Sequence, residues 1–118
     1  MYVIVLTTGI FGSFACVTDY ITISCPANRT ILINEALYGQ YTSTCPENTC
    51  CSPHPINDCL ETVEDNSPQD WLVMKEICDN ATQCGFQVPG GLVLTCVDPY
   101  DIHYMTVYYS CLPGNYKL

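Results

Sequence analysis

The stretch "ALYGQYTSTC", from Ala36 to Cys45, sets an aromatic residue and a glycine between a strand-like run and a cysteine. Residues 30–39, "TILINEALYG", alternate apolar side chains with polar neighbours, which is the period of a half-buried strand. We therefore expect a strand that stops at Gly39, where a residue without a Cβ suits a tight bend. The aromatic residue and glycine at its end are a candidate binding surface.

Three more strands and one long loop are expected along the chain. Residues 19–25, "DYITISC", and 103–111, "HYMTVYYSC", alternate with the same period of two, and 90–97, "GGLVLTCV", is a short apolar run. Residues 45–66 are rich in Pro, Asn, Ser and Cys, which is typical of a loop. Only cross-links could hold a loop of that length in a compact domain.

A single helix is expected within residues 66–80, "NSPQDWLVMKEICDN". Ser67 can cap it, Pro68 suits its first position, and Asp70 places negative charge in the first turn. The side chains expected to face the core are Trp71, Met74 and Cys78, with Ile77 beside them. Four strands and one helix predict a small, disulfide-rich α+β domain that is mainly antiparallel.

The composition excludes several classes of partner. The 118 residues are one domain by size, and they include ten cysteines, twelve acidic residues and three basic residues, for a net charge of −9. Three scattered cations cannot displace counterions from phosphate, so a nucleic-acid partner is excluded and anionic membrane surfaces are disfavoured. Beyond the N-terminus no apolar run reaches the roughly 18 residues of a membrane span, so no membrane insertion is expected.

The N-terminus and two short motifs favour the secretory route. Residues 1–15, "MYVIVLTTGIFGSFA", are apolar and uncharged, and Ser13 and Ala15 occupy the small-residue positions of a signal-peptidase site. The alternative is that this run forms the first strand of the domain. Asn28 in "NRT" and Asn80 in "NAT" are N-glycosylation acceptors, which matter only in that route. We expect a signal peptide over 1–15 and a secreted, extracellular glycoprotein.

The sequence contains no motif or residue spacing that would support catalysis or metal binding. No nucleophile motif is present, and the two histidines, His54 and His103, lie in a Pro-rich loop and in a strand. Four residues of metal-ligand type fit no common zinc spacing: Cys50, Cys51, His54 and Cys59. Four carboxylates lack the central glycine of a calcium loop and are better interpreted as a solvated face: Glu61, Glu64, Asp65 and Asp70. We expect no enzyme activity, no cofactor and no metal.

The intervals between cysteines carry a more specific signal. Eight residues separate Cys16 from Cys25, nineteen separate Cys25 from Cys45, thirteen separate Cys45 from Cys59, and five separate Cys78 from Cys84. With "ALYGQ" before the third cysteine and "DPY…YYSC" at the end, the chain resembles the rhamnose-binding lectin family, also called the sea-urchin-egg-lectin-like or galactose-binding lectin domain. The resemblance implies a lectin-like domain over residues 16–111 and a tail over 112–118.

The family's cysteine pairing implies four disulfides here. They would be Cys16–Cys45, Cys25–Cys111, Cys59–Cys96 and Cys78–Cys84. Each would contribute on the order of 2–4 kcal/mol by restricting the unfolded chain. Cys50 and Cys51 are left over, and they can close a strained ring with each other or bond another chain, so the oligomeric state stays open.

The resemblance also implies where a ligand would bind. The chain keeps the family's Tyr38, Gly39, Asp98, Pro99 and Tyr104, but it lacks the family's Gly-Thr turn. Four positions differ, because Val17, Leu37, Gln40 and His103 replace an acidic residue, an asparagine, an arginine and a lysine. Most polar contacts to a rhamnose-like sugar are therefore missing.

Five residues are candidates for ligand binding: Tyr38, Gln40, Asp98, Asp101 and His103. The tyrosine would stack on a sugar, Asp98 would accept a hydrogen bond and the histidine would donate one, while Gln40 and Asp101 could rebuild a polar site. The alternatives are core packing for Tyr38, turn capping for Asp98 and a solvent-facing position for His103.

Two functions follow from the resemblance. The first is a secreted carbohydrate-binding module with altered or weakened sugar specificity, whose partner is a glycan or an extracellular glycoprotein. The alternative is an extracellular protein–protein adhesion or recognition module that keeps the lectin scaffold without binding sugar. Exposed tyrosines suit both, because tyrosine serves sugar stacking and protein interfaces alike.

Overall fold

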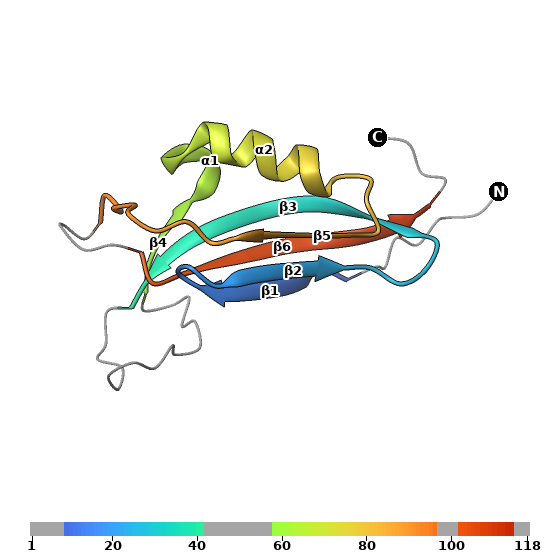
Figure 1. Cartoon of the computed structure of the whole chain (residues 1–118), viewed down its shortest axis with the longest axis horizontal. Helices are drawn as coiled ribbons and strands as arrows, with labels where there is room; N and C mark the ends of the chain where they lie inside the picture. The colour runs from blue at the N-terminus through green and yellow to red at the C-terminus, as the bar shows by residue number, and fades with distance from the viewer. Residues whose placement is uncertain (1–8, 42–57, 97–101, 115–118) are drawn as a thin grey trace.

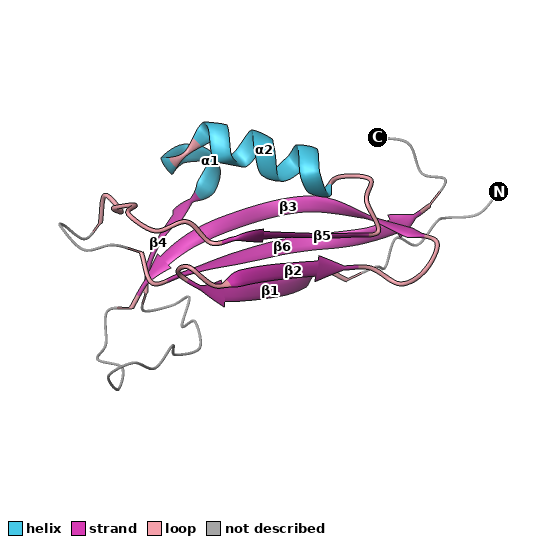
Figure 2. Ribbon diagram, in the orientation of Figure 1, coloured by secondary structure: helices cyan, strands magenta, loops and turns pink. Residues whose placement is uncertain are grey.

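The computed structural model of the chain describes residues 9–41, 58–96 and 102–114. Two antiparallel sheets and a helical segment make up the fold (Figures 1 and 2). The elements in chain order are β1 (Phe11–Cys16), β2 (Tyr20–Ser24), β3 (Arg29–Gln40), β4 (Cys59–Thr62), α1 (Val63–Asn66), α2 (Pro68–Cys78), β5 (Gln83–Gln87) and β6 (Tyr104–Pro113). The larger sheet has the strand order β1-β6-β3-β4, and β2 pairs with β5. The expected class, a small disulfide-rich α+β domain, is confirmed.

Three of the four expected strands are confirmed as β2, β3 and β6, with ends that shift by one or two residues. The strand expected over 90–97 is wrong for its described part, residues 90–96, which form a loop with a single bridge at Val93. Gly91 has a φ of +80°, which turns the backbone out of an extended path. Leu94 is buried and anchors the loop to the core, so its apolar residues serve packing instead of pairing.

Two strands and one helix were not expected. The long loop predicted over 45–66 is wrong for residues 59–66, which form β4 and α1, while 42–57 lie outside the described residues. β4 pairs with the end of β3, from Leu37↔Thr62 to Gln40↔Cys59. β5 contains Gly85, and the ring of Tyr20 on β2 occupies the space that a Cβ would fill there. The sequences of β4 and β5 show little alternation of apolar and polar residues, so the strands were not recognised.

The predicted helix is confirmed as α2. Pro68 holds its first position, and Ser67 holds the cap position, although its hydroxyl donates to the Asn66 side chain instead of capping the helix. Met74 and Cys78 are buried as expected, whereas Ile77 is 45% exposed. Within the described residues no helix is long and apolar enough to cross a membrane.

β1 lies at one edge of the larger sheet. It pairs with β6 from Phe11↔Tyr109 to Cys16↔Tyr104, and Ala15 packs against the core. The sequence assigned most of this strand to a signal peptide and kept a first strand as the alternative. Cleavage after Ala15 would remove five of the six residues of β1, and that cleavage stays a prediction.

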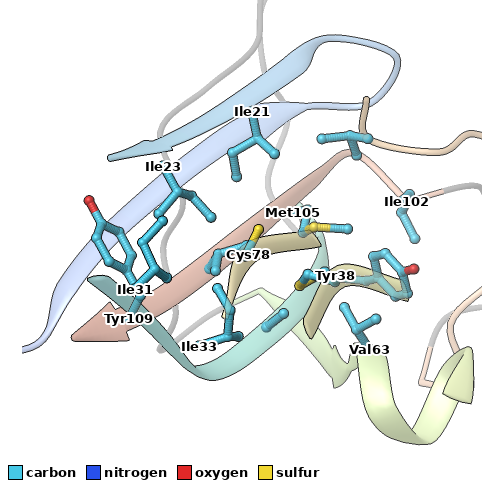
Figure 3. Close-up of a cluster of buried hydrophobic side chains, with 14 of the residues drawn as sticks. Ile21, Ile23, Ile31, Ile33, Tyr38, Val63, Cys78, Ile102, Met105 and Tyr109 are labelled. Carbon is cyan, nitrogen blue, oxygen red and sulfur yellow. The ribbon is translucent and has the colours of Figure 1, made fainter. Parts of the chain in front are cut away.

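One continuous core lies between the inner face of the larger sheet, the β2–β5 pair and α2 (Figure 3). Its main side chains are Ile21, Ile23, Ile31, Ile33, Tyr38, Val63, Met74, Cys78, Ile102, Met105, Val107 and Tyr109. Each aliphatic or aromatic side chain buried in this way contributes about 1.5–3 kcal/mol relative to an exposed position.

Three of the four disulfides implied by the resemblance are present. They are Cys25–Cys111, Cys59–Cys96 and Cys78–Cys84. Cys16 is also disulfide-bonded. Its implied partner, Cys45, lies outside the described residues, as do Cys50 and Cys51.

Candidate functional site

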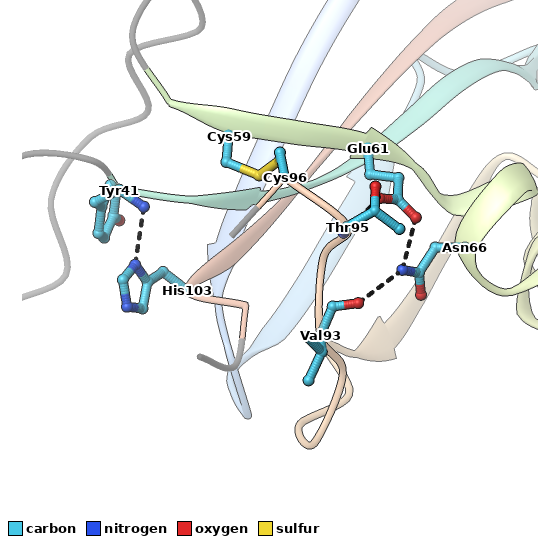
Figure 4. The surroundings of a disulfide bond; sticks show 8 residues. All are labelled: Tyr41, Cys59, Glu61, Asn66, Val93, Thr95, Cys96 and His103. Atoms are coloured by element: carbon cyan, nitrogen blue, oxygen red, sulfur yellow. Dashed lines mark hydrogen bonds between the residues drawn. A yellow bond between two sulfur atoms is a disulfide. The ribbon is translucent and has the colours of Figure 1, made fainter. Parts of the chain in front are cut away.

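Four strands of the larger sheet have an end at the same place, where β1 and β3 finish and where β4 and β6 begin. Backbone bonds join these ends, because the N–H of His103 donates to Gly39 O at 2.8 Å and the N–H of Val17 donates to His103 O at 2.8 Å. The group of residues there, called the strand-end site below, consists of Tyr41, Asp58, Glu61, Thr95 and His103 together with the buried Tyr104 (Figure 4 shows four of them).

Tyr104 lies across Gly39. A Cβ on Gly39 would collide with the Tyr104 ring, so this position needs a glycine because of the close approach of the ring. The sequence expected a bend at Gly39, but β3 continues through Gln40. The Tyr104 hydroxyl donates to Asp58 Oδ2 at 2.6 Å, and burial raises the pKa of Tyr104 well above its ordinary value. This tyrosine and Asp58 therefore connect the start of β6 to the start of β4.

Tyr41 and His103 form a stacked pair at the end of β3. Their ring centroids are 4.8 Å apart, with an interplanar angle of 23°. The Tyr41 backbone N–H donates to His103 Nδ1 at 2.9 Å, as Figure 4 shows. In the neutral imidazole the proton is therefore on Nε2, which makes this nitrogen the donor of the ring; that it donates to a ligand stays a prediction.

Glu61 holds the loop before Cys96 against β4. Its Oε2 accepts from the Thr95 backbone N–H at 3.0 Å and from the Thr95 hydroxyl at 2.7 Å, and its Oε1 accepts from the Asn66 amide at 2.9 Å. These bonds, the Thr95 backbone bond first, lower the pKa of Glu61. The same Asn66 amide donates to Val93 O, and the Cys59–Cys96 disulfide lies beside this network (Figure 4). Both carboxylate oxygens of Glu61 thus accept hydrogen bonds from within the protein.

Tyr38 does not line the strand-end site. It is fully buried on the inner face of the sheet, where its hydroxyl donates to Asp70 Oδ2 of α2 at 3.5 Å. A bulge in β3 between Ile33 and Glu35 places it there, because the extra residue reverses the inward and outward sides of the strand. Strict alternation from Ile33 would point Tyr38 outward.

The remaining candidate ligand residues divide into two groups. Gln40 and His103 both lie at the strand ends, but Gln40 is only 2% exposed, since the bulge turns it inward as well. Asp98 and Asp101 lie outside the described residues. Of the three candidates that the structure describes, Gln40 and His103 come together at the strand ends, and His103 alone of these three lies on the strand-end site.

The strand-end site is acidic. Asp58 and Glu61 contribute carboxylates, and the two described basic residues lie elsewhere. Arg29 is at the far end of β3 and donates to Cys111 O at 3.3 Å, while Lys75 on α2 pairs with Asp79 at 3.7 Å. Among residues 9–41, 58–96 and 102–114 no three side chains of ligand type converge as a metal site would require.

Both predicted glycosylation acceptors lie at the end opposite the strand-end site. Asn28 and Asn80 are exposed in turns and have φ values of 67° and 69°. The backbone N–H of Asn80 donates to Ile31 O, which places this turn beside the start of β3. Residues 31 and 40 of one strand are about 30 Å apart. Glycans on these asparagines would leave the strand-end site uncovered.

Sequence reasoning did not identify Tyr41, Asp58 or Thr95. Tyr41 directly follows the "ALYGQ" step, so an aromatic residue beside His103 could have been inferred from the register of β3 and β6. Asp58 and Thr95 have no such signal, because they reach the site only through β4 and through the loop that the Cys59–Cys96 disulfide holds.

Comparison with known proteins gives distant relatives, and no family model matches the chain. It is 28% identical over 103 residues to adhesion G protein-coupled receptor L1 of Bos taurus, covering 87% of this chain and 6% of the receptor. It is 29% identical over 108 residues to protein eva-1 homolog C of Mus musculus, covering 89% and 23%. It is 26% identical over 113 residues to protein eva-1 of Caenorhabditis elegans, covering 86% and 24%. The chain spans at most 24% of the length of these curated relatives.

Proposed function

We propose that this chain is an extracellular, non-enzymatic recognition module of the rhamnose-binding lectin type, and that its strand-end site binds a protein partner. The similarity to an adhesion receptor and to two eva-1 proteins covers most of the chain. The disulfides support an extracellular location, since such bonds persist in oxidising compartments.

One observation carries the choice of a protein over a rhamnose-type sugar. Most polar groups of the strand-end site bond within the molecule: the Tyr104 hydroxyl to Asp58, the Thr95 hydroxyl to Glu61 and the Tyr41 backbone N–H to His103 Nδ1. The tyrosine expected to stack on a sugar is buried beneath α2. A rigid, acidic surface with aromatic groups suits a protein interface, because little ordering entropy is lost on binding.

A sugar is the second candidate. The Tyr41–His103 stack offers an aromatic surface at the end of β3, and His103 Nε2–H is a donor beside it. A polyhydroxyl ligand could use both, which would be the altered sugar specificity that the sequence predicts. In that case the partner would be a glycan or a glycoprotein recognised through its glycan.

The deciding experiment distinguishes a protein ligand from a glycan ligand. The disulfide-bonded chain, made in a secretory host, is screened against a glycan array and against a panel of purified ectodomains. Each captured ectodomain is tested again after enzymatic deglycosylation. We expect binding that survives deglycosylation and an array without signal. Binding that disappears with the glycan, or a specific array signal, would assign the site to sugar.

A tyrosine pair provides the control for the location of the site. Tyr41→Ala removes the aromatic surface at the strand ends, whereas Tyr20→Ala removes a tyrosine that is 66% exposed on β2. Loss of binding with Tyr41→Ala and retention with Tyr20→Ala would place the partner on the strand-end site. The reverse result would contradict the proposal, provided that both variants unfold near the wild-type temperature.

A further inference from the structure

A second concave surface lies between α2 and β5, away from the strand-end site. This α2–β5 cleft has a volume of about 150 Å³, with Val73, Met74 and Ile77 on the helix side and Phe86 and Pro89 on the strand side. Tyr38 and Met105 form its floor. Its lining is therefore mostly apolar, with Asp70 and Gln87 as its polar members.

The helix side of the cleft leaves apolar surface in contact with water. Val73 is 43% exposed and Ile77 45% exposed, and Leu72 is exposed on the neighbouring surface of α2. Covering apolar surface contributes about 25 cal/mol for each Å² removed from water. An occupant of the cleft must consequently have an apolar portion, of about the length of one side chain.

The mouth of the cleft carries negative charge. Asp70 lines it, and its Oδ2 accepts from the Tyr38 hydroxyl at 3.5 Å. The acidic residues of this helical segment are Glu64, Asp65, Asp70, Glu76 and Asp79. The one base of the segment, Lys75, lies 3.7 Å from Asp79 and 5.4 Å from the centroid of Trp71. Asp70 lies in the first turn of α2, and the base of the segment pairs with Asp79 instead, so the Asp70 carboxylate keeps its charge toward the cleft.

From this combination we infer that the α2–β5 cleft binds an arginine side chain presented by a basic segment of a partner protein. The methylene stem of arginine would lie against Val73, Ile77 and Phe86, and its guanidinium would donate to the Asp70 carboxylate. A planar guanidinium also packs against an aromatic ring such as Phe86. The net charge of −9 favours a basic partner in general.

This site is separate from the strand-end site, so either can fail without the other. The test uses three small probes with the isotope-labelled full chain: N-acetyl-arginine methylamide, its uncharged analogue N-acetyl-citrulline methylamide, and N-acetyl-norleucine methylamide. We expect the arginine probe to shift the amide resonances of Val73, Ile77, Phe86 and Gln87. It should bind about fivefold more tightly than citrulline, near the upper range for an exposed ion pair, and the difference should shrink at high salt.

Matched variants on α2 test the two contacts separately: the guanidinium with Asp70, and the methylene stem with the apolar residues of the cleft. Asp70→Asn should reduce arginine binding to the citrulline level, while Glu76→Gln removes the same charge outside the cleft and should change affinity less than twofold. Ile77→Ser should weaken all three probes, whereas Leu72→Ser, a similar loss of exposed apolar surface, should not.

Several results would overturn the inference. These are an absence of shifts at the cleft residues with every probe, equal affinity for arginine and citrulline, tighter binding of norleucine, and equal effects of Asp70→Asn and Glu76→Gln. Dispersed amide spectra of each variant show that the domain is folded, so a lost interaction cannot be attributed to unfolding.

Discussion

The two ends of the β3–β6 pair are held by different kinds of interaction. At the turn end, formed by residues 25–33, 78–84 and 109–114, the Cys25–Cys111 and Cys78–Cys84 disulfides act together with backbone bonds such as Ile31 N–H to Ala81 O. The strand-end site also has the Cys59–Cys96 disulfide, the disulfide of Cys16 and backbone bonds, but there the carboxylates of Glu61 and Asp58 add side-chain bonds. Covalent and backbone bonds depend little on the neighbouring side chains. The turn end therefore supports the fold, and the strand-end site derives its surface from individual residues.

Removing one disulfide from each end should give the largest effects. Cys25→Ala with Cys111→Ala opens a link of 86 residues, and Cys59→Ala with Cys96→Ala opens one of 37. The chain-entropy relation gives losses of about 4.6 and about 3.8 kcal/mol in the free energy of unfolding. Cys111 is also buried whereas Cys96 is exposed, which widens the difference.

Guanidinium denaturation of both double variants measures this contrast. We expect the turn-end variant to unfold at the lower midpoint. A strand-end variant that is the less stable of the two would mean that the loop before Cys96 supports the fold more than its exposure suggests.

Gly39→Ala tests the packing of the strand-end site without removing any group that forms a side-chain hydrogen bond. The new Cβ would displace the Tyr104 ring, and with it the hydrogen bond to Asp58, at a cost of about 3 kcal/mol. In the full chain, made with residues 1–15 retained, Gly9→Ala is the control, because a Cβ at Gly9 meets open space. Urea denaturation should show a large loss for the first variant and almost none for the second. A loss below about 1 kcal/mol for Gly39→Ala would show that the ring moves freely.

The sequence predicted the elements that show a clear hydrophobic period and missed those that do not. β2, β3, β6 and α2 carry periodicity over several residues, so one face of each is recognisable without knowledge of its partners. β4 has four residues and β5 has five, and both owe their extended form to pairing with distant segments. The residues of a short strand do not show which distant segment it pairs with.

The bulge in β3 explains why the candidate site was only partly predictable. The alternation that identified the strand also assigned its two faces, and that assignment is wrong after Ile33. One additional residue moved Tyr38 and Gln40 from the outer to the inner side, and no residue type in "INEA" marks it. His103, expected as the first residue of a strand, lies directly before β6, and its role as a ligand residue stays a prediction.

Alkaline pH tests the buried inner face of the larger sheet, because the Tyr38 hydroxyl lies there. Burial raises the pKa of Tyr38 to about 12, from about 10 in the unfolded chain. The neutral phenol is thus favoured in the folded state, so its contribution is complete below about pH 10 and is lost as the pH rises through about 12. We expect the free energy of unfolding to fall by about 2–3 kcal/mol over that window.

Tyr38→Phe should make this alkaline decrease smaller. Urea denaturation at about pH 9 and about pH 11 compares the variant with the wild type. Part of the decrease should remain, because the pKa of Tyr104 is raised as well. Identical decreases in the two proteins would show that Tyr38 does not titrate in this range.

The smallest expected effects come from removing one tyrosine hydroxyl at each end. The Tyr104 hydroxyl donates to the Asp58 carboxylate at 2.6 Å, a short bond to a charged acceptor, whereas the Tyr109 hydroxyl donates to the Ser24 carbonyl at 3.4 Å. Because bonds to charged groups contribute more, Tyr104→Phe should cost about 2 kcal/mol and Tyr109→Phe about 0.5 kcal/mol in the free energy of unfolding. Both rings stay buried in these variants, so packing is nearly constant and urea denaturation reports mainly the bonds. Equal losses would contradict the view that side-chain bonds to carboxylates matter more at the strand-end site than side-chain bonds do at the turn end. A larger loss for Tyr104→Phe together with weaker binding of the protein partner would link that bond to the shape of the recognition surface.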